Sequence, residues 1–373
     1  MRIIFTGGGT GGHVFPIIAV CREIRKIRPD FQFYYIGPKD EFGTFLLSRE
    51  GIKVKTILAG KIRRYWDLNS FFQNLLDILK IPIGFLQSFF YVFLLFPDLI
   101  FSKGGYGSLS TSLLGWIFLT PIILHESDIT PGFSNRLISK VSVEIFVSFP
   151  VREIEYFSFK KMISVGNPIR KEILEGSRGE AVKLFGLSEE KPIILILGGS
   201  QGSQRINDLV LNILPQLLNN FQIIHQTGSK NFKQVETEAR IMIQKPLEKY
   251  YHPFPFLNET ELKHALKTSD LVVSRAGSGS IFEIAAVGKP SILIPLPESA
   301  QNHQIKNAYA YQNSGGCIVI EEKNLTPHFF LERLKYLLSE SDELKKMQAA
   351  AKKFSRPRAA EIIAGYIVEY LIY

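Results

Sequence analysis

The sequence contains very little cysteine, and this scarcity limits the kinds of site that it could hold. Cys21 and Cys317 are the only two cysteines among 373 residues, and neither belongs to a CxxC or CxxH pattern. We therefore expect no metal site and a reducing compartment, with a single disulfide between the two as the alternative. No apolar leader precedes the first strand-like run, Arg2 to Phe5, which argues against secretion and favours a cytoplasmic protein.

Acidic residues are also in short supply relative to basic ones. The chain has 35 Asp and Glu against 44 Lys and Arg, a formal net charge of +9. This balance predicts an anionic partner, which could be nucleic acid, a phosphate-bearing substrate or an acidic membrane surface. With 46% hydrophobic and 21% charged residues, the chain is globular and long enough for two domains.

Long hydrophobic runs are limited to one segment, ILKIPIGFLQSFFYVFLLFP at residues 78–97, which approaches the length of a membrane span. Lys80, Pro82 and Gly84 interrupt it, and the strand-like PDLIFS follows directly. A spanning helix would separate that strand from its sheet. We therefore expect a buried or half-buried helix inside an α/β domain.

Short β-rich runs alternate with helical stretches along the chain, which is typical of βαβ units and parallel sheets. Gly and Pro in VGNPIR, Val165 to Arg170, interrupt this pattern, and it restarts at Lys191. We predict two Rossmann-like domains facing each other across a cleft, with ligands beyond the carboxyl ends of the strands. The predicted strands are Arg2–Phe5, Phe33–Ile36, Leu99–Ser102, Ile122–Leu124, Glu144–Val147, one directly after Lys191, Gln222–His225, Leu271–Ser274 and Ser291–Ile294.

The first strand is followed by a glycine-rich turn in FTGGGTGGHVFP, where Gly7, Gly9 and Gly12 satisfy GxGxxG. This spacing would indicate a dinucleotide, but the second strand ends with Gly37 where an acidic residue should hold the ribose. No GK[ST] follows the turn, which excludes an ATP-type loop. What remains is a helix N-terminus that can receive an anion, with tight strand-to-helix packing as the alternative.

His13 lies at the start of the helix that follows this turn. The positive end of the helix dipole there would lower its pKa and favour the neutral imidazole. His13 is therefore a candidate catalytic base, and a purely structural histidine is the alternative.

The second half of the chain contains another set of ligand-binding signals. GGSQG, Gly198 to Gly202, offers the same backbone cradle together with the hydroxyl of Ser200, which suits a diphosphate. In SRAGSGSIFE, Glu283 could accept both hydroxyls of a ribose or simply complement the helix dipole. Gln304, in the polar segment AQNHQIKNA, could reach sugar hydroxyls.

Seven segments together resemble a known family: GGTGGHVFP, SKGGYGS, LHESDITPG, GNPIR, GGSQGS, SRAGSGSIFE and NHQIKNA. They follow the order and approximate spacing found in the MurG family of bacterial glycosyltransferases (glycosyltransferase family 28), over nearly the whole chain. The resemblance implies a GT-B fold and inverting transfer of N-acetylglucosamine from UDP-N-acetylglucosamine (UDP-GlcNAc) to lipid I, giving lipid II. Lipid I is the undecaprenyl-diphosphate-linked muramyl pentapeptide, and its muramyl 4-hydroxyl is the acceptor. No metal or other cofactor is implied.

The resemblance also implies a division of the chain. Residues 1–163 would form a Rossmann-like domain on the acceptor and membrane side, and residues 164–355 a Rossmann-like domain holding the donor. Residues 356–373 would form a helix that returns to the first domain.

Carried over to matching positions, the resemblance assigns the site residues. Ser200 would meet the donor diphosphate, Glu283 the ribose, Leu257 the uracil through its backbone, and Gln304 the donor sugar. From the chemistry that such a transfer needs, and not from the family, we expect His13 to be the base, with Glu126 as the rival. The full donor set is Thr10, Gly11, Gly12, Asp128, Arg170, Ser200, Leu257, Ser278, Gly279, Ser280, Glu283 and Gln304, and the acceptor set is Gly8, Gly9 and Tyr106.

One of these positions departs from the family pattern. Many family members read HEQN where this chain reads HESD, ending in Asp128. A carboxylate at that position accepts hydrogen bonds as the asparagine does but cannot donate them.

The family resemblance suggests which anionic partner the positive charge serves. GIKVKTILAGKIRRYW, residues 51–66, holds five basic residues and no acidic one, and precedes the apolar stretch Leu75 to Phe96. This favours a peripheral protein on the cytoplasmic face of the cell membrane, resting on its anionic inner leaflet, with no nucleic acid partner. A solvated basic loop beside a core helix is the alternative. A diacylglycerol glycosyltransferase, a UDP-sugar epimerase and a non-enzymatic nucleotide-sugar-binding protein also remain open.

Overall fold

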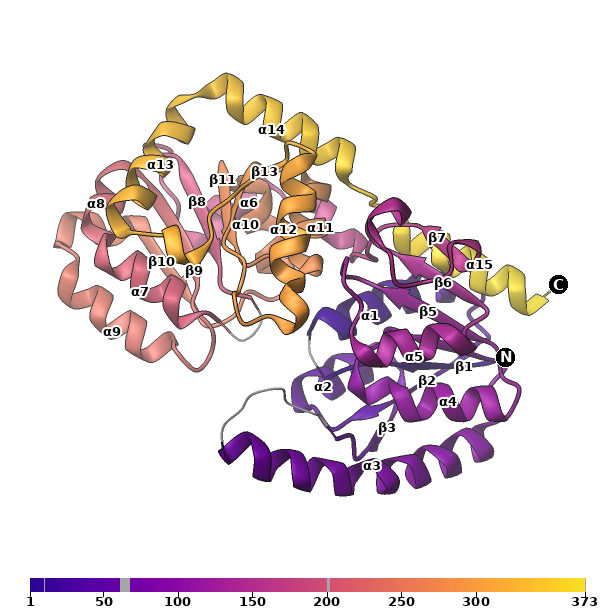
Figure 1. Cartoon of the computed structure of the whole chain (residues 1–373). Coiled ribbons are helices and arrows are strands. Elements are labelled where there is room, and N and C mark those ends of the chain that lie inside the picture. The colour runs from indigo at the N-terminus through magenta and orange to yellow at the C-terminus, as the bar shows by residue number, and fades with distance from the viewer. Residues whose placement is uncertain (10, 61–67, 200–201, 373) are drawn as a thin grey trace. The chain divides into compact units, whose positions relative to one another are not determined.

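The computed structural model describes residues 1–9, 11–60, 68–199 and 202–372, with the side chains of helix α3 described from Asp77 onward (Figure 1). The chain divides into two compact units. The first comprises Met1–Arg170 and Pro357–Tyr373, and the second comprises Lys171–Arg356. Each unit is built on its own parallel sheet and is described by itself.

The first unit has a seven-stranded parallel sheet in the order β3-β2-β1-β4-β5-β6-β7. The chain moves outward from β1 in one direction and then from β4 in the other, so the strand order reverses between β1 and β4. Its strands are β1 Arg2–Thr6, β2 Gln32–Pro38, β3 Lys53–Ile57, β4 Leu99–Ser102, β5 Ile122–Glu126, β6 Glu144–Val147 and β7 Met162–Ser164. Its helices are α1 Gly11–Ile27, α2 Glu41–Arg49, α3 Leu68–Leu95, α4 Leu109–Ile117, α5 Phe133–Val141 and α15 Ala359–Ile372.

The second unit repeats this topology with a six-stranded parallel sheet in the order β10-β9-β8-β11-β12-β13. Here the order reverses between β8 and β11. The strands are β8 Ile193–Leu197, β9 Gln222–Gln226, β10 Tyr251–Phe254, β11 Leu271–Ser274, β12 Ser291–Leu293 and β13 Cys317–Val319. The helices are α6 Arg178–Phe185, α7 Gln204–Asn212, α8 Leu214–Asn220, α9 Phe232–Met242, α10 Glu259–Thr268, α11 Ser278–Val287, α12 His303–Asn313, α13 Pro327–Ser339 and α14 Ser341–Phe354.

Local capping signals explain several helix boundaries. Helix α10 begins with a capping box in which Asn258 and Glu261 each accept from the other's backbone N–H. Helices α6 and α11 end at Gly186 and Gly288, whose φ values of 65° and 72° belong to the left-handed region.

Four strands are absent from the sequence-based prediction: β3, β7, β10 and β13. All four lie at the edges of the two sheets. Central parallel strands are buried on both faces and therefore form continuous apolar runs, whereas edge strands need not. In β3, for example, the exposed lysines Lys53 and Lys55 interrupt the apolar pattern.

The C-terminal helix α15 belongs to the core of the first unit. It packs against α1, and its residues Ile363, Ala364 and Ile367 are fully buried in the same cluster as Ile3 and Phe5 of β1. In Figure 1, α15 lies along the first unit even though it follows the whole second unit in the sequence. The chain therefore crosses between the units twice.

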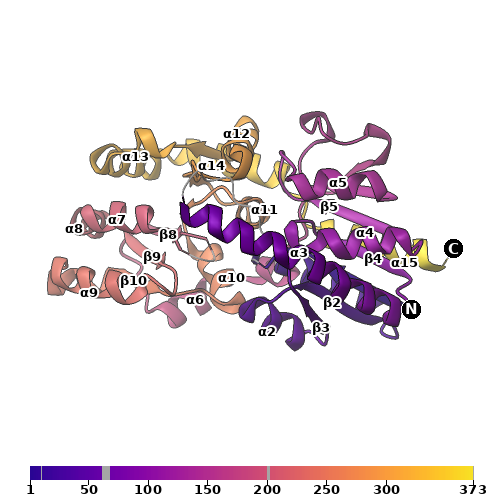
Figure 2. The ribbon, with the colours of Figure 1, turned by 60° about the horizontal axis from the view of Figure 1, so that its bottom comes forward.

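Helix α3 is not the buried or half-buried helix that the sequence predicted. Only 17% of the stretch Asp77–Leu95 is buried, and of the described residues this stretch alone is long and apolar enough to cross a membrane. Figure 2 shows α3 running alongside α4, which it contacts together with β3. Its buried positions are Asp77, Gly84, Ser88 and Val92.

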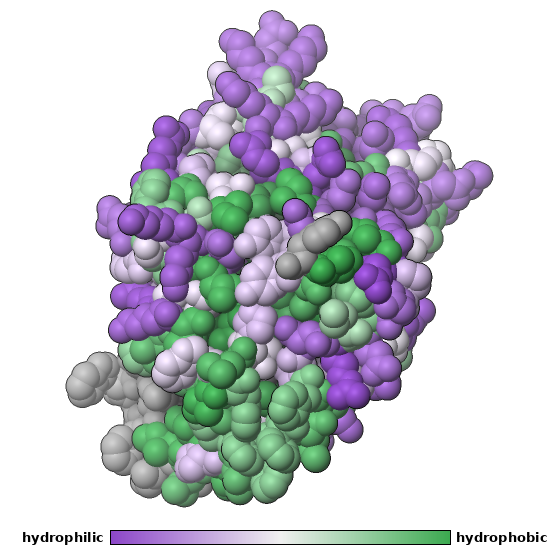
Figure 3. All heavy atoms as spheres, turned by 90° about the vertical axis from the view of Figure 1, so that its right-hand side faces the viewer, coloured by the Kyte–Doolittle hydropathy of each residue, from purple (hydrophilic) through white to green (hydrophobic). Residues whose placement is uncertain are grey.

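The side of α3 that faces the protein is thus largely small or polar. The Ser88 hydroxyl lies 3.0 Å from that of Ser110 on α4, and Gly84 has no room for a Cβ because the Leu58 carbonyl lies against it. The exposed side carries the large apolar residues, which we call the α3 apolar face: Ile78, Leu79, Ile81, Ile83, Leu86, Phe89, Phe90, Phe93 and Leu94. Figure 3 shows apolar side chains gathered at the bottom of the view, on the first unit.

We expect Ile367→Ala to lower the free energy of unfolding of the first unit by about 3 kcal/mol, because it removes buried methyl groups between α15 and α1. Urea unfolding followed by tryptophan fluorescence measures this, since Trp116 belongs to that unit and the sequence of the second unit contains no tryptophan. Ile362→Ala is the matched control, because Ile362 is 48% exposed on the same helix. Equal effects of the two substitutions would contradict the placement of α15.

Candidate functional site

The carboxyl ends of β1, β4 and β5 bring the first group of candidate residues together. Thr6 pairs with Ser102, and Ser102 pairs with Leu124, so the loops leaving the three strands share one edge of the sheet. Of the predicted residues, the end of β5, these loops and the start of α1 carry Gly8, Gly9, Gly11, Gly12, His13, Tyr106, Glu126 and Asp128. Thr10 lies outside the described residues.

The glycines of the first turn make room for the His13 ring. A Cβ on Gly8 would lie 2.8 Å from His13 Cδ2, and one on Gly105 would lie 3.1 Å from His13 Cε1. Gly105 also has a φ of 85°, which side chains rarely adopt. Part of the glycine requirement therefore comes from packing around an imidazole and not from a ligand.

Hydrogen bonding and burial fix the chemical state of His13. Its Nδ1 lies 3.3 Å from the carbonyl oxygen of Lys103, which can only accept, so Nδ1 carries the proton and Nε2 the lone pair. Burial, and then the positive charge of Lys103, lower the pKa of His13 to about 4. The imidazole is therefore neutral at pH 7 and able to accept a proton at Nε2.

Tyr35 explains why no acidic residue ends β2. Its buried hydroxyl donates to the carbonyl oxygens of Gly7 and Gly8, at 3.2 and 3.4 Å, and these hydrogen bonds stabilise the turn. Gly37 points to the same side of the strand, where the Tyr35 ring leaves no room for a side chain. The position that would hold a cofactor ribose is thus occupied by internal packing.

Glu126 is held by donors at both carboxylate oxygens. Its Oε1 accepts from the Asp128 N–H at 2.9 Å, and its Oε2 accepts from Asn135 Nδ2 at 2.6 Å. The Asn135 Oδ1 in turn accepts from the Gly105 N–H at 2.8 Å. Burial, and then the charge of Asp128, raise the pKa of Glu126. This chain of hydrogen bonds joins the loop after β5 to the loop that covers His13.

Lys103 is a site residue that the sequence reasoning missed. It is almost fully buried, and its Nζ donates to Ser127 Oγ, which donates to Asn167 Oδ1 at 3.0 Å. Burial lowers its pKa, while the charges of Glu126 and Asp128 oppose that change. The position within SKGGYGS, directly after an apolar strand, was a usable signal, because a lysine there must be buried or must serve the site.

Arg170 belongs to the first unit and not to the second. It is buried, and its guanidinium stacks 4.0 Å from the ring of Phe15, on the same helix as His13.

In the second unit the turn after β8 is linked to the predicted uracil contact. Gln226 Nε2 donates to the Gly199 carbonyl at 3.0 Å, and Gln226 Oε1 accepts from the Leu257 N–H at 3.0 Å. Gly202 has a φ of 78° and no room for a Cβ against the Thr227 carbonyl. Ser200 lies outside the described residues. Gln226, which the sequence reasoning missed, thus connects the two predicted parts of a nucleotide site.

The remaining predicted residues follow β11 and β12. Gly277 precedes the first residue of α11, Ser278, and Gly279 and Ser280 lie in the first turn of that helix, with the half-buried Glu283 one turn later. Gln304 lies on α12, where its Oε1 accepts from the Leu296 N–H at 3.0 Å. Leu197 of β8 pairs with Ser274 of β11, and Ser274 with Leu293 of β12, so these segments share one edge of the sheet.

Comparisons with known proteins agree with this architecture. Residues 3–147 match the model of the glycosyltransferase family 28 N-terminal domain, and residues 193–363 that of the C-terminal domain. A curated Clostridium kluyveri protein is 36% identical over 367 residues, covering 98% of this chain and 99% of the relative. It is named UDP-N-acetylglucosamine--N-acetylmuramyl-(pentapeptide) pyrophosphoryl-undecaprenol N-acetylglucosamine transferase.

Two solved structures show the fold. The crystal structure of Acinetobacter baumannii MurG matches with a TM-score of 0.73 at 22% identity and covers 99% of both chains. A Neisseria meningitidis UDP-GlcNAc 2-epimerase bound to UDP-GlcNAc matches with a TM-score of 0.67 at 14% identity, over 99% of this chain and 100% of the other. The predicted GT-B fold is confirmed, and the fold alone does not separate a transferase from an epimerase.

We expect Lys103→Met to raise the pKa of His13 above its native value of about 4 but not to 6.5, because burial remains when the nearby positive charge is removed. Titration of the histidine resonances by NMR measures this. Lys289→Met is the matched control, since Lys289 is a partly buried lysine of the second unit whose pKa burial also lowers. A native His13 that titrates near 6.5 would contradict the described environment.

Proposed function

The chain belongs to glycosyltransferase family 28, and from that premise we propose that it transfers N-acetylglucosamine from UDP-GlcNAc to the muramyl 4-hydroxyl of lipid I, giving lipid II. The observation that carries this proposal is the 36% identity, over nearly the full length of both chains, to a curated transferase named for that reaction. The epimerase likeness rests on fold at 14% identity and has no comparable sequence support.

In this reaction His13 acts as the general base. The muramyl hydroxyl is a weak nucleophile until its proton is removed, and the neutral His13 has its Nε2 lone pair available at pH 7. In Glu126, the rival, both carboxylate oxygens already accept hydrogen bonds, one from the Asp128 N–H and one from Asn135. We therefore assign Glu126 to holding the loops around His13, not to taking the proton.

The second unit receives the nucleotide of the donor. Gly202 and the N-cap Ser203 precede α7, whose N-terminal backbone N–H groups and helix dipole favour the growing negative charge of UDP. Ser200, which lies outside the described residues, is assigned to the same diphosphate. Glu283 accepts the ribose hydroxyls. Because the Leu257 N–H is already donated to Gln226, a backbone contact of Leu257 with uracil uses its carbonyl oxygen.

The other predicted contacts complete the site. Thr10, Gly11, Gly12, Asp128, Arg170 and Gln304 serve the donor sugar and diphosphate, whereas Gly8, Gly9 and Tyr106 serve the acceptor. Arg170 and the residues at the edge of the first sheet belong to the same unit as His13. In this assignment the first unit supplies the base, the acceptor contacts and some of the donor contacts, and the second unit supplies the nucleotide contacts.

The α3 apolar face supports a peripheral position on the cytoplasmic side of the cell membrane. Large apolar residues face outward and small or polar ones face inward, the reverse of the usual surface helix. Next to this face, Trp116, Ile117 and Leu119 at the end of α4 are 55%, 57% and 90% exposed. Lys55 of β3 lies 5.9 Å from the ring of Tyr91 on α3. Lys61, Arg63 and Arg64 of the basic segment lie outside the described residues.

We expect the protein to form a lipid-linked disaccharide from labelled UDP-GlcNAc and a lipid I analogue, but not from UDP-glucose or with diacylglycerol as acceptor. His13→Ala should lower kcat by about 10²- to 10⁴-fold, because it removes the base, and leave the Kd for UDP-GlcNAc unchanged. Thin-layer chromatography of the products and calorimetry measure these quantities. Epimerised UDP-sugar without disaccharide, or near-normal turnover of His13→Ala, would contradict the respective assignment.

We expect the protein to float with vesicles containing phosphatidylglycerol and much less with phosphatidylcholine alone, because apolar insertion and basic residues act together. The double substitution Phe90→Glu and Phe93→Glu, at positions 53% and 49% exposed, should abolish flotation. Ile241→Glu is the control, since Ile241 is 81% exposed on α9 of the second unit. Flotation of the double variant at the wild-type level would refute the membrane role of this face.

A further inference from the structure

Residues 294–304, which we call loop 294–304, comprise the connection from β12 to α12 and the first two residues of α12, the second of which is Gln304. Three hydrogen bonds hold it to itself: the Leu296 N–H donates to Gln304 Oε1 at 3.0 Å, the Gln304 N–H donates to Ser299 Oγ at 3.2 Å, and the Ser299 N–H donates to the Leu296 carbonyl at 3.2 Å. The orientation of the Gln304 side chain therefore depends on the shape of the whole loop.

This loop contains two consecutive residues in an unfavourable backbone conformation. Gln301 and Asn302 have φ values of 56° and 55°, in the left-handed region that residues with a Cβ adopt only at an energetic cost. Such a conformation persists when the surrounding contacts determine it, and it is common beside functional sites. The loop therefore needs contacts from outside itself.

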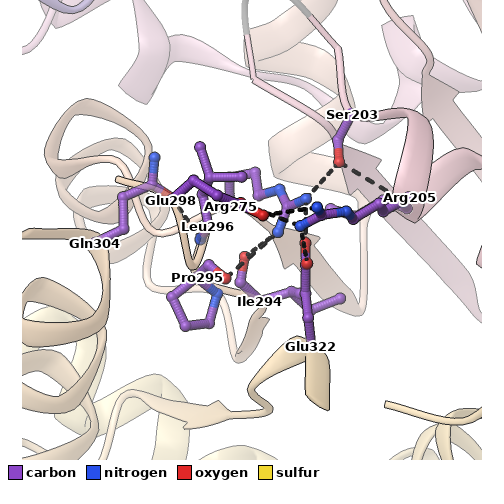
Figure 4. A network of polar contacts seen from close by, with 10 residues as sticks. Ser203, Arg205, Arg275, Ile294, Pro295, Leu296, Glu298, Gln304 and Glu322 are labelled. Atoms are coloured by element: carbon purple, nitrogen blue, oxygen red, sulfur yellow. Dashed lines mark hydrogen bonds and ion pairs between the residues drawn. The ribbon is translucent and has the colours of Figure 1, made fainter. Parts of the chain in front are cut away.

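Two arginines from other elements supply those contacts, as Figure 4 shows. Arg275, buried after β11, donates from Nη1 to the carbonyl oxygens of Ile294 and Pro295 at 3.1 and 3.4 Å. Arg205, on α7, forms a fork to Glu298 with distances of 3.1 and 2.6 Å.

The same arginines join the loop to the turn that follows β8. Glu322 pairs with both guanidinium groups, at 2.5 Å each. Arg275 also donates to Ser203 Oγ at 2.7 Å, and Ser203 is the N-cap of α7. One ionic network thus ties the start of α7 to the loop that carries Gln304.

We propose that Arg205 is a positioning residue for the donor sugar: its fork to Glu298 holds loop 294–304 in the conformation in which Gln304 contacts the N-acetylglucosamine. This rests on the proposed function, which places UDP-GlcNAc in the second unit. Arg205 and Glu298 are 57% and 48% exposed, and exposed pairs contribute little to folding. The pair acts instead by ordering the loop before the donor arrives, which lowers the cost of binding.

The test measures the affinities of the protein for UDP and for UDP-GlcNAc by calorimetry. The ratio of the UDP-GlcNAc affinity to the UDP affinity isolates the contribution of the sugar. In Arg205→Ala this ratio should fall about fivefold or more, since the loop must be ordered during binding, while the Kd for UDP stays within about twofold of wild type. The KM for UDP-GlcNAc should rise with kcat unchanged. Arg205→Lys, which keeps the charge but not the fork, should give an intermediate ratio.

Further variants test whether the effect comes from the contact between Arg205 and Glu298. Glu298→Ala removes only the fork and should lower the ratio as Arg205→Ala does, whereas Arg205→Ala also removes the pair with Glu322. The double variant should be no worse than Arg205→Ala, because the fork is already absent there. Arg240→Ala is the control: Arg240 is an exposed helix arginine of the same unit, paired with Glu236 at 3.1 Å, and should leave the ratio unchanged.

Each other outcome has a separate meaning. If the wild-type protein binds neither UDP nor UDP-GlcNAc, the donor assignment fails and the inference fails with it. If it binds both with equal affinity, the contact of Gln304 with the sugar adds nothing to binding and the inference alone is wrong. If the wild type distinguishes them and Arg205→Ala does so equally well, the inference alone is wrong. If Arg205→Ala loses UDP affinity to the same extent as UDP-GlcNAc affinity, Arg205 acts on the diphosphate and not on the sugar loop, which also overturns the inference.

Discussion

The parallel hydrogen bonding of the two sheets is the constraint that places the candidate residues of each unit. In each unit the strand order reverses beside the first strand, between β1 and β4 and again between β8 and β11. The loops that leave neighbouring strands at their carboxyl ends must then meet at one edge. The same rule therefore produces one edge that carries His13 in the first unit and another in the second unit that carries the segments after β8, β11 and β12.

Two buried or bridging cations organise these edges. In the first unit, the Lys103 ammonium group donates to Ser127 in the loop after β5, and the Lys103 carbonyl sets the tautomer of His13. In the second unit, Arg275 connects the N-cap of α7 to the loop after β12. A buried cation requires such partners, because leaving it unpaired is far more costly than forming the network. Both side chains thus give rigidity to loops that would otherwise be free to move.

The sequence allowed the fold class, the central strands and the candidate segments to be predicted, because these depend on local patterns. Continuous apolar runs identify strands that are buried on both faces, and glycine after such a run identifies a turn. The edge strands β3, β7, β10 and β13 were missed because their burial is incomplete and their pattern is mixed. Gln226 was missed because a single polar residue has no periodicity that separates a site residue from a surface one. Lys103 was missed although its position directly after an apolar strand was a usable signal.

The sequence by itself determined which segments form the sheets, which turns lack side chains, and the family to which the chain belongs. Only the tertiary structure decided which side of α3 faces outward, since an apolar helix gives no periodic signal and its direction depends on the fit of Gly84 and Ser88 against their neighbours. It also decided that the glycines beside His13 seat an imidazole and that Arg205 reaches Glu298. These properties depend on contacts between residues far apart in the chain, and local patterns do not encode such contacts.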